Sequence, residues 1–206
     1  MSEKEQAPGT ALLKLFDSAV EAYDDVLWVA STAGSKNLEK TVTELVRRLL
    51  AKKDLISDYA ARIANIYKIS ATVAGRRADE RKVRRLLYDA MKLEELTDYM
   101  WDEARKRDDS VSFSNYPAMA KNFVKSLLES GGNLRTFYKK VRVLVSEMAK
   151  LSQELLSEAS DNLAIIGILP RKRVLEEFEE SLGESVPDVG KLSEPVNDNE
   201  SGESDQ

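Results

Sequence analysis

The chain has 206 residues, of which 42% are hydrophobic and 33% are charged, with a formal net charge of −5 and neither cysteine nor histidine. This length is enough for one helical domain with a sizeable core. Without cysteine the chain has no disulfides, thiolate nucleophiles or cysteine-ligated metal centres. Without histidine it lacks the commonest general base and metal ligand. We therefore expect a protein that is not an enzyme and binds no cofactor.

The charge is distributed unevenly along the sequence. From residue 176 to the end there are eleven acidic residues against one lysine, a net charge of −10, whereas residues 9–175 carry a net charge of +6. Residues 183–206 are rich in Glu, Asp, Ser, Asn, Pro and Gly, a composition typical of disordered segments. We expect a flexible N-terminus over residues 1–9, a helical domain over residues 10–182 and a disordered acidic tail over residues 183–206.

The first predicted helix runs from Thr10, a candidate N-cap residue, to about residue 33. The longest apolar pattern in the chain follows, from Leu38 to Val73, with core positions at alternating steps of four and three residues. Only Lys52 and Ser70 interrupt this seam. A single helix of this extent would be about 54 Å long. We predict such a helix, antiparallel to the first, in which Lys52 either extends its amine to solvent or sets the register of a helix pair.

A third helix is predicted to begin within residues 76–80 and to end in Arg105, Lys106 and Arg107, three consecutive cations that suit the negative end of the helix dipole. Its core seam consists of Val83, Leu86, Ala90, Leu93, Thr97, Met100 and Ala104. We expect Leu87, Met91 and Trp101 to widen this apolar face, and Tyr88 and Tyr99 to lie in the core with their polar tips at its edge.

The C-terminal part of the helical region contains two further helices and a short one. Pro117 suits the first turn of a fourth helix that ends at the glycine pair 131–132. Asn133 then caps a fifth helix, whose seam runs from Leu134 to Leu155 and continues more loosely to Leu163. A short amphipathic helix, Arg171 to Leu182, is a candidate docking element for the bundle or for a partner groove. Its apolar stripe includes Leu175, Phe178 and Leu182.

Together these patterns predict an all-α fold: an elongated, mostly antiparallel bundle of five to six helices, with long heptad-patterned helices of the coiled-coil type. No apolar run is long enough to cross a bilayer. The polar, mixed-charge start of the sequence shows no secretory or transit signal, so we expect a cytoplasmic protein.

Basic residues form the most distinctive polar feature. Those at the start of the third helix share one helical face by their spacing of four and three residues, and such a row can follow a phosphate backbone. Ordinary solvated helix faces with surface ion pairs explain the same residues. The candidate contact residues for a polyanion or a protein partner are Arg47, Arg48, Lys53, Arg77, Arg81, Arg84, Arg85, Arg135, Lys139 and Lys140.

Three functions are compatible with the sequence. The first is a helical interaction or assembly subunit that presents long helix faces to protein partners, which include further copies of itself. The second is sequence-nonspecific binding of nucleic acid or another polyanion, restrained by the acidic tail. The third is a carboxylate-metal hydrolase, although solvated acids give the same pattern. It is suggested by the stripe Glu94, Asp98 and Asp102 with Glu95 beside it, and by Glu21 and Asp24 on the first helix, which repeat the spacing of Glu95 and Asp98.

Overall fold

The computed structural model describes residues 8–32 and 37–167, with side chains from residue 14 onward. This part of the chain contains six α-helices and one 3-10 helix: α1 (Pro8–Ser31), α2 (Leu38–Lys52), η1 (Lys53–Leu55), α3 (Ile56–Val73), α4 (Glu80–Arg107), α5 (Tyr116–Glu129) and α6 (Leu134–Ile165). The predicted all-α helical bundle is confirmed. The predicted docking helix Arg171–Leu182 and the acidic tail lie outside the described residues.

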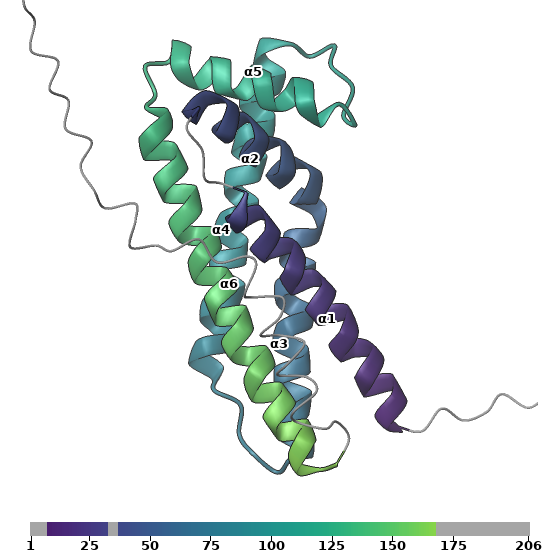
Figure 1. Ribbon diagram of the computed structural model, residues 1–206. Coiled ribbons are helices and arrows are strands. Elements are labelled where there is room, and N and C mark those ends of the chain that lie inside the picture. Colours follow the sequence, from purple (N-terminus) through teal and green to yellow (C-terminus); the bar gives the residue numbers. More distant parts are fainter. Residues whose placement is uncertain (1–7, 33–36, 168–206) are drawn as a thin grey trace, which may run out of the picture.

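Helices α1, α3, α4 and α6 lie side by side and form an elongated body (Figure 1). Helices α2 and α5 pack against each other at the end of the body where α4 ends and α6 begins. The direction of α1 is opposite to that of α3, since Ser18 contacts Arg62 and Asp25 contacts Tyr59. In the same way, α4 and α6 are antiparallel. Helix α1 packs mainly on α6 and α3 and makes only slight contact with α2.

The predicted single helix from Leu38 to Val73 is wrong in one respect, because η1 divides it into α2 and α3. No proline or glycine is present at the break. Instead, tertiary contacts stabilise it: Lys52 donates to Asp25 of α1 at 2.7 Å, and Lys53 donates to Asp98 of α4. The two halves of the seam therefore serve different partners. Helix α2 packs on α5, whereas α3 packs on α1, α4 and α6.

Helix starts follow the chemistry expected of N-caps at most positions. The side-chain oxygens of Asn37, Asp79 and Asn133 accept backbone hydrogen bonds at the starts of α2, α4 and α6. Pro117 lies in the first turn of α5, as predicted. The prediction for Thr10 is wrong, because α1 begins at Pro8 and Thr10 lies inside the helix.

The core runs the length of the body and contains most positions of the predicted seams, but Val73, the last position of the Leu38–Val73 seam, is 50% exposed. Val42, Leu49 and Ile63 are at most 2% exposed, as are Leu86 on α4 and Leu155 on α6. Removing such side chains from water supplies most of the stabilisation, at about 1.5–3 kcal/mol for each. The packing of α4 against α3 on one side and α6 on the other leaves one face of α4 turned outward, and this face contains the candidate site described next.

Candidate protein-interaction surface

The basic residues of α2 and η1 are engaged within the molecule. Arg47 donates to Glu44 at 2.7 Å, and Arg48 donates to the same carboxylate and places its guanidinium over the ring of Trp28. The hydrogen bond from Arg47, with a further one from Arg48, lowers the pKa of Glu44 to about 2. Lys53 is paired with Asp98, as noted above. These three predicted contact residues therefore act in packing and pairing on the bundle itself.

The basic residues near the start of α4 fall into two groups. Arg85 donates to Glu147 of α6 at 3.0 Å and lies 3.8 Å from Asp89. Arg77, Arg81 and Arg84 are exposed, and their guanidinium groups form no ion pair within the described part of the chain. These three side chains are therefore available to a ligand or a partner.

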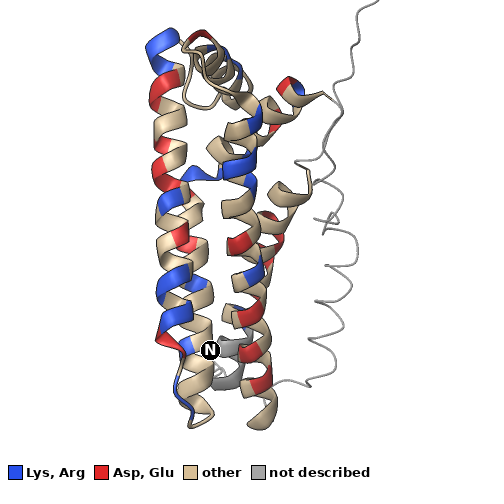
Figure 2. Ribbon diagram, turned by 90° about the vertical axis from the view of Figure 1, so that its left-hand side faces the viewer, with Lys and Arg blue, Asp and Glu red and all other residues tan. Residues whose placement is uncertain are grey.

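Arg135, Lys139 and Lys140 form a separate basic group in the first two turns of α6. They are exposed and likewise make no ion pair with any described residue. Because α6 is antiparallel to α4, this group lies at the other end of the body from Arg81 and Arg84. Acidic residues such as Asp89 and Glu147 lie between the two groups, and blue and red segments alternate along the helices in Figure 2. The candidate basic residues do not form one continuous face.

The outward face of α4 contains a pattern that the sequence reading missed. Residues at steps of three and four form what we term the outer stripe: Arg81, Arg84, Tyr88, Met91, Glu95, Tyr99 and Asp102. Its central members are unusually exposed for their type, with 52% of Tyr88 and 47% of Met91 accessible, and Leu87 beside them is 40% exposed. The expected burial of Leu87, Met91, Tyr88 and Tyr99 in the core is therefore wrong, whereas Trp101 is partly buried as a ring stacked on Phe113.

Asp89, which lies at the border between the outer stripe and the core of α4, is a buried acid. Its side chain is 7% exposed and faces Glu147 and Arg85. Burial raises the pKa of Asp89, Glu147 raises it further, and the guanidinium of Arg85 opposes both effects. The charge thus comes at a cost in stability that the pair with Arg85 only partly offsets.

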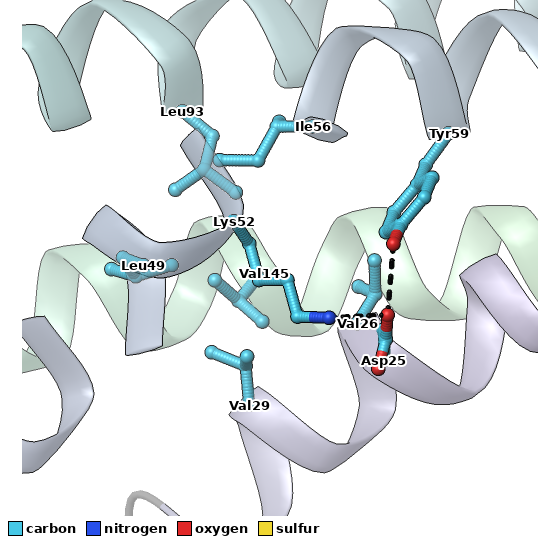
Figure 3. A pocket seen from close by; sticks show the side chains of 9 residues that line it. All are labelled: Asp25, Val26, Val29, Leu49, Lys52, Ile56, Tyr59, Leu93 and Val145. Atoms are coloured by element: carbon cyan, nitrogen blue, oxygen red, sulfur yellow. Dashed lines mark hydrogen bonds and ion pairs between the residues drawn. The ribbon is translucent and has the colours of Figure 1, made fainter. Parts of the chain in front are cut away.

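Two cavities among the described residues differ in size and lining. Figure 3 shows one between α1, α2 and α3, where Asp25 accepts hydrogen bonds from Lys52 and Tyr59 and the rest of the lining is apolar. Its volume of about 20 Å³ has room for about one water molecule. Burial and the bond to Asp25 raise the pKa of Tyr59 to about 12. Lys52 is therefore held in a cross-helix ion pair, which differs from the predicted extension to solvent.

A larger, polar cavity of about 260 Å³ lies between α3, the connection from α3 to α4, and α6, at the other end of the body. Arg76 and Arg77 line it from the connection between α3 and α4, and Glu158, Asp161 and Asn162 line it from α6. Arg76 donates a hydrogen bond to Asn162, which in turn donates one to Ser70, and the donor–acceptor distance is 3.4 Å in both. The lining contains both basic and acidic side chains, so the cavity favours neither anionic nor cationic ligands.

The acidic residues proposed as metal ligands are dispersed or engaged. Glu94 accepts a hydrogen bond from Ser57, and Asp98 is paired with Lys53. Among residues 8–32 and 37–167 no group of three or more acidic side chains is arranged to hold a metal ion. Within the same residues, no helix has the length and apolar character needed to span a membrane.

Comparisons of the chain with protein-family models, with curated proteins and with solved structures find no match.

Proposed function

We propose that the protein is a non-enzymatic helical interaction subunit, and that the outer stripe of α4 is the surface that binds its protein partner. The observation that supports this most directly is the exposure of Tyr88 and Met91, at 52% and 47%, on a helix whose opposite side is packed. Tyr99 continues the same line at 48% exposed, and its ring meets that of Phe123 of α5 edge to face. Soluble monomeric domains rarely leave several large apolar side chains contiguous on a helix face, and such patches mark interaction sites.

The composition of the outer stripe fits a protein partner. Tyrosine, methionine and arginine are enriched in the centres of protein interfaces, where the first two supply contact area and arginine supplies directed hydrogen bonds. Met91 also has an unbranched side chain that adapts to irregular partner surfaces. The charged residues at both ends of the outer stripe would then form the polar rim of the interface.

The experiment that tests this proposal compares partner capture by the wild-type chain and by a chain with Tyr88→Ser and Met91→Ser. Both are exposed, so the variant keeps its helical content and melting temperature close to those of the wild type. We expect the variant to lose a specific set of bound proteins that the wild type retains. A matched control, Val143→Ser on the exposed side of α6, is expected to retain them, since Val143 is 58% exposed but lies off the outer stripe. Identical capture by all three chains would contradict the proposal.

Polyanion binding is the second candidate, and it is supported by the guanidinium groups of Arg77, Arg81 and Arg84, which form no ion pair with any described residue. These three arginines, one just before α4 and two in its first turns, form a short basic row, so the expected affinity is low and strongly dependent on salt. Deletion of residues 184–206 is expected to raise the affinity for nucleic acid, and Arg81→Gln with Arg84→Gln to reduce it and to flatten its salt dependence. No binding of nucleic acid by the tailless chain at low salt would exclude this function.

A further inference from the structure

The outer stripe of α4 is electrically bipolar. Residues 76–85, at the start of α4 and just before it, contain six Lys and Arg against two acids, whereas residues 94–103 contain five acids and no base. In Figure 2, where α4 runs along the left side, blue segments dominate its lower part and red ones the part above it, and blue returns at its upper end. Between the two charged parts lie Leu87, Tyr88 and Met91, which are all exposed. On the outer stripe itself, Arg81 and Arg84 precede this apolar centre and Glu95 and Asp102 follow it. Lys92 lies over the ring of Tyr88, and the helix ends in Arg105, Lys106 and Arg107 beyond the stripe.

Such an arrangement is complementary to itself when two copies meet antiparallel. A two-fold axis at Met91 places Arg81 of one copy within about 1.5 Å, along the helix axis, of the level of Asp102 of the second copy. The same axis brings Tyr88 to the level of Glu95 and opposes the two Met91 side chains. A parallel arrangement would bring like charges together and is therefore disfavoured. Because of the two-fold symmetry, each favourable pair occurs two times in the dimer.

The charges needed for this contact are available. Arg81, Arg84, Glu95 and Asp102 are exposed and form no ion pair within the described residues. Asp98, by contrast, is on the flank of α4 and is paired with Lys53. The helices inside the bundle use the same principle, because the basic start of α4 meets acidic residues of antiparallel α6 through Arg85 with Glu147 and Lys82 with Glu154. Within the bundle, the basic start of α4 thus pairs with an acidic part of an antiparallel helix, as we expect between two copies.

We propose that the partner of the outer stripe is a second copy of this chain, bound antiparallel through α4 about a two-fold axis at Met91. This inference rests on the proposed interaction function and names its partner. The stripe from Arg81 to Asp102 is about 33 Å long on a helix about 10 Å wide, so it buries several hundred Å² per copy, at the low end of interface sizes. We expect a weak dimer that dissociates on dilution.

Sedimentation velocity of the full-length chain between about 1 and 500 µM tests the contact together with its charge pattern. We expect Arg81→Glu with Arg84→Glu, which makes the outer stripe acidic throughout, to weaken self-association about tenfold or more. Glu95→Lys with Asp102→Lys, which makes it basic throughout, is expected to do the same. Mixing these two variants restores a dimer, now a heterodimer, because each supplies the charge that the other lacks. Arg135→Glu with Lys139→Glu, a change of equal charge on α6, leaves self-association as in the wild type.

The absence of cysteine from the chain allows the axis to be located. Met91→Cys places one thiol from each copy next to the axis, and we expect a disulfide-linked dimer under mild oxidation. Tyr99→Cys places the two thiols about 24 Å apart along the helix axis, so this control variant is expected to remain unlinked. Both positions are about half exposed in the bundle, which keeps the folding of the two variants comparable.

Three results would overturn the inference: a monomer over the whole concentration range, a dimer unaffected by the acidic variant, or equal cross-linking at positions 91 and 99. A monomer whose capture of other proteins is still lost with Tyr88→Ser and Met91→Ser would refute self-association and leave the proposed interaction function standing. A monomer with unchanged capture would refute both. Recovery of the heterodimer by mixing cannot arise from misfolded variants, so the charge exchange separates a loss of contact from a loss of structure.

Discussion

The two faces of α4 have the same residue spacing and opposite environments. On the inner face Val83, Leu86 and Met100 are at most 1% exposed, whereas on the outer face Tyr88, Met91 and Tyr99 are about half exposed. Both rows follow steps of three and four residues. The difference shows that periodicity identifies a helix face, while burial depends on whether neighbouring helices cover it. On α4 the helices α3 and α6 cover only the inner face, and α5 covers the C-terminal part, where its Phe123 meets the ring of Tyr99.

The largest expected effect is a difference in stability between a substitution on the inner face of α4 and one on its outer face. Leu86→Ala removes a fully buried side chain between packed helices, and we expect the free energy of unfolding to fall by about 2–5 kcal/mol, because a cavity adds to the lost transfer free energy. Met91→Ala removes a side chain of similar size from the outer face and is expected to cost less than about 0.5 kcal/mol. Chemical denaturation, at a concentration low enough to keep the chain monomeric, measures both.

This pair of variants also provides its own control. Both changes replace a large apolar residue by the best helix former at an interior position of α4, so differences in helix propensity are small. Equal losses of stability for Leu86→Ala and Met91→Ala would show that the outer face is packed in solution against another part of the chain. In that case the outer stripe would not be a surface for partners.

Asp89 lies at the border of the two faces and gives the second prediction. Burial raises the pKa of Asp89, so the folded chain retains this proton to a higher pH than the unfolded chain does. Stability therefore falls as the pH rises from the ordinary aspartate pKa through the raised value, and the full cost is present at neutral pH. We expect Asp89→Asn to be more stable than the wild type at pH 7 and equal to it near pH 3, with a smaller effect than Leu86→Ala.

Unfolding curves at several pH values test whether Asp89→Asn gains stability relative to the wild type as the pH rises. The gain of stability in Asp89→Asn should grow with pH over the window above the ordinary aspartate pKa and then level off. Arg85 opposes the shift, so removing it by Arg85→Gln in the wild-type background should widen the window. A variant that loses stability at pH 7 would mean that the ion pair of Asp89 with Arg85, at 3.8 Å, outweighs the burial of the charge.

Much of the fold could be predicted from the sequence because its causes are local. Cap residues such as Asn133 lie within three residues of the amide that they bind, and core seams follow from helical geometry. The break at η1 could not be predicted in this way. It contains neither proline nor glycine, and the contacts that stabilise it, from Lys52 to Asp25 and from Lys53 to Asp98, join helices far apart in sequence.

In the candidate site, too, the local interactions could be predicted from the sequence and the long-range ones could not. The pairing of Arg47 with Glu44 follows from a three-residue spacing, so the sequence could have indicated that this cation is engaged. The pairs of Arg85 with Glu147 and of Lys82 with Glu154 depend on the placement of α6 beside α4. The outer stripe was misassigned because Met91 and Tyr88 adjoin the core seam, and apolar residues beside a seam are usually buried with it. The change from positive to negative charge along α4, from Arg81 to Asp102, was the sequence feature that could have indicated a second, exposed face.

The smallest effect concerns the flank of α4, where Asp98 is paired with Lys53 of η1. This pair bridges α4 to the break in the long helix, and the hydrogen bond to Asp98 raises the pKa of Lys53. Because 51% of the Asp98 side chain is exposed, solvent screens the interaction, and we expect a coupling of about 0.2–1 kcal/mol from a double-mutant cycle with Lys53→Met and Asp98→Asn. Self-association should be unchanged in either variant, since Asp98 is outside the outer stripe. A weakened dimer in Asp98→Asn would instead extend the acidic end of the contact around the flank of α4, and the position of the two-fold axis would have to shift accordingly.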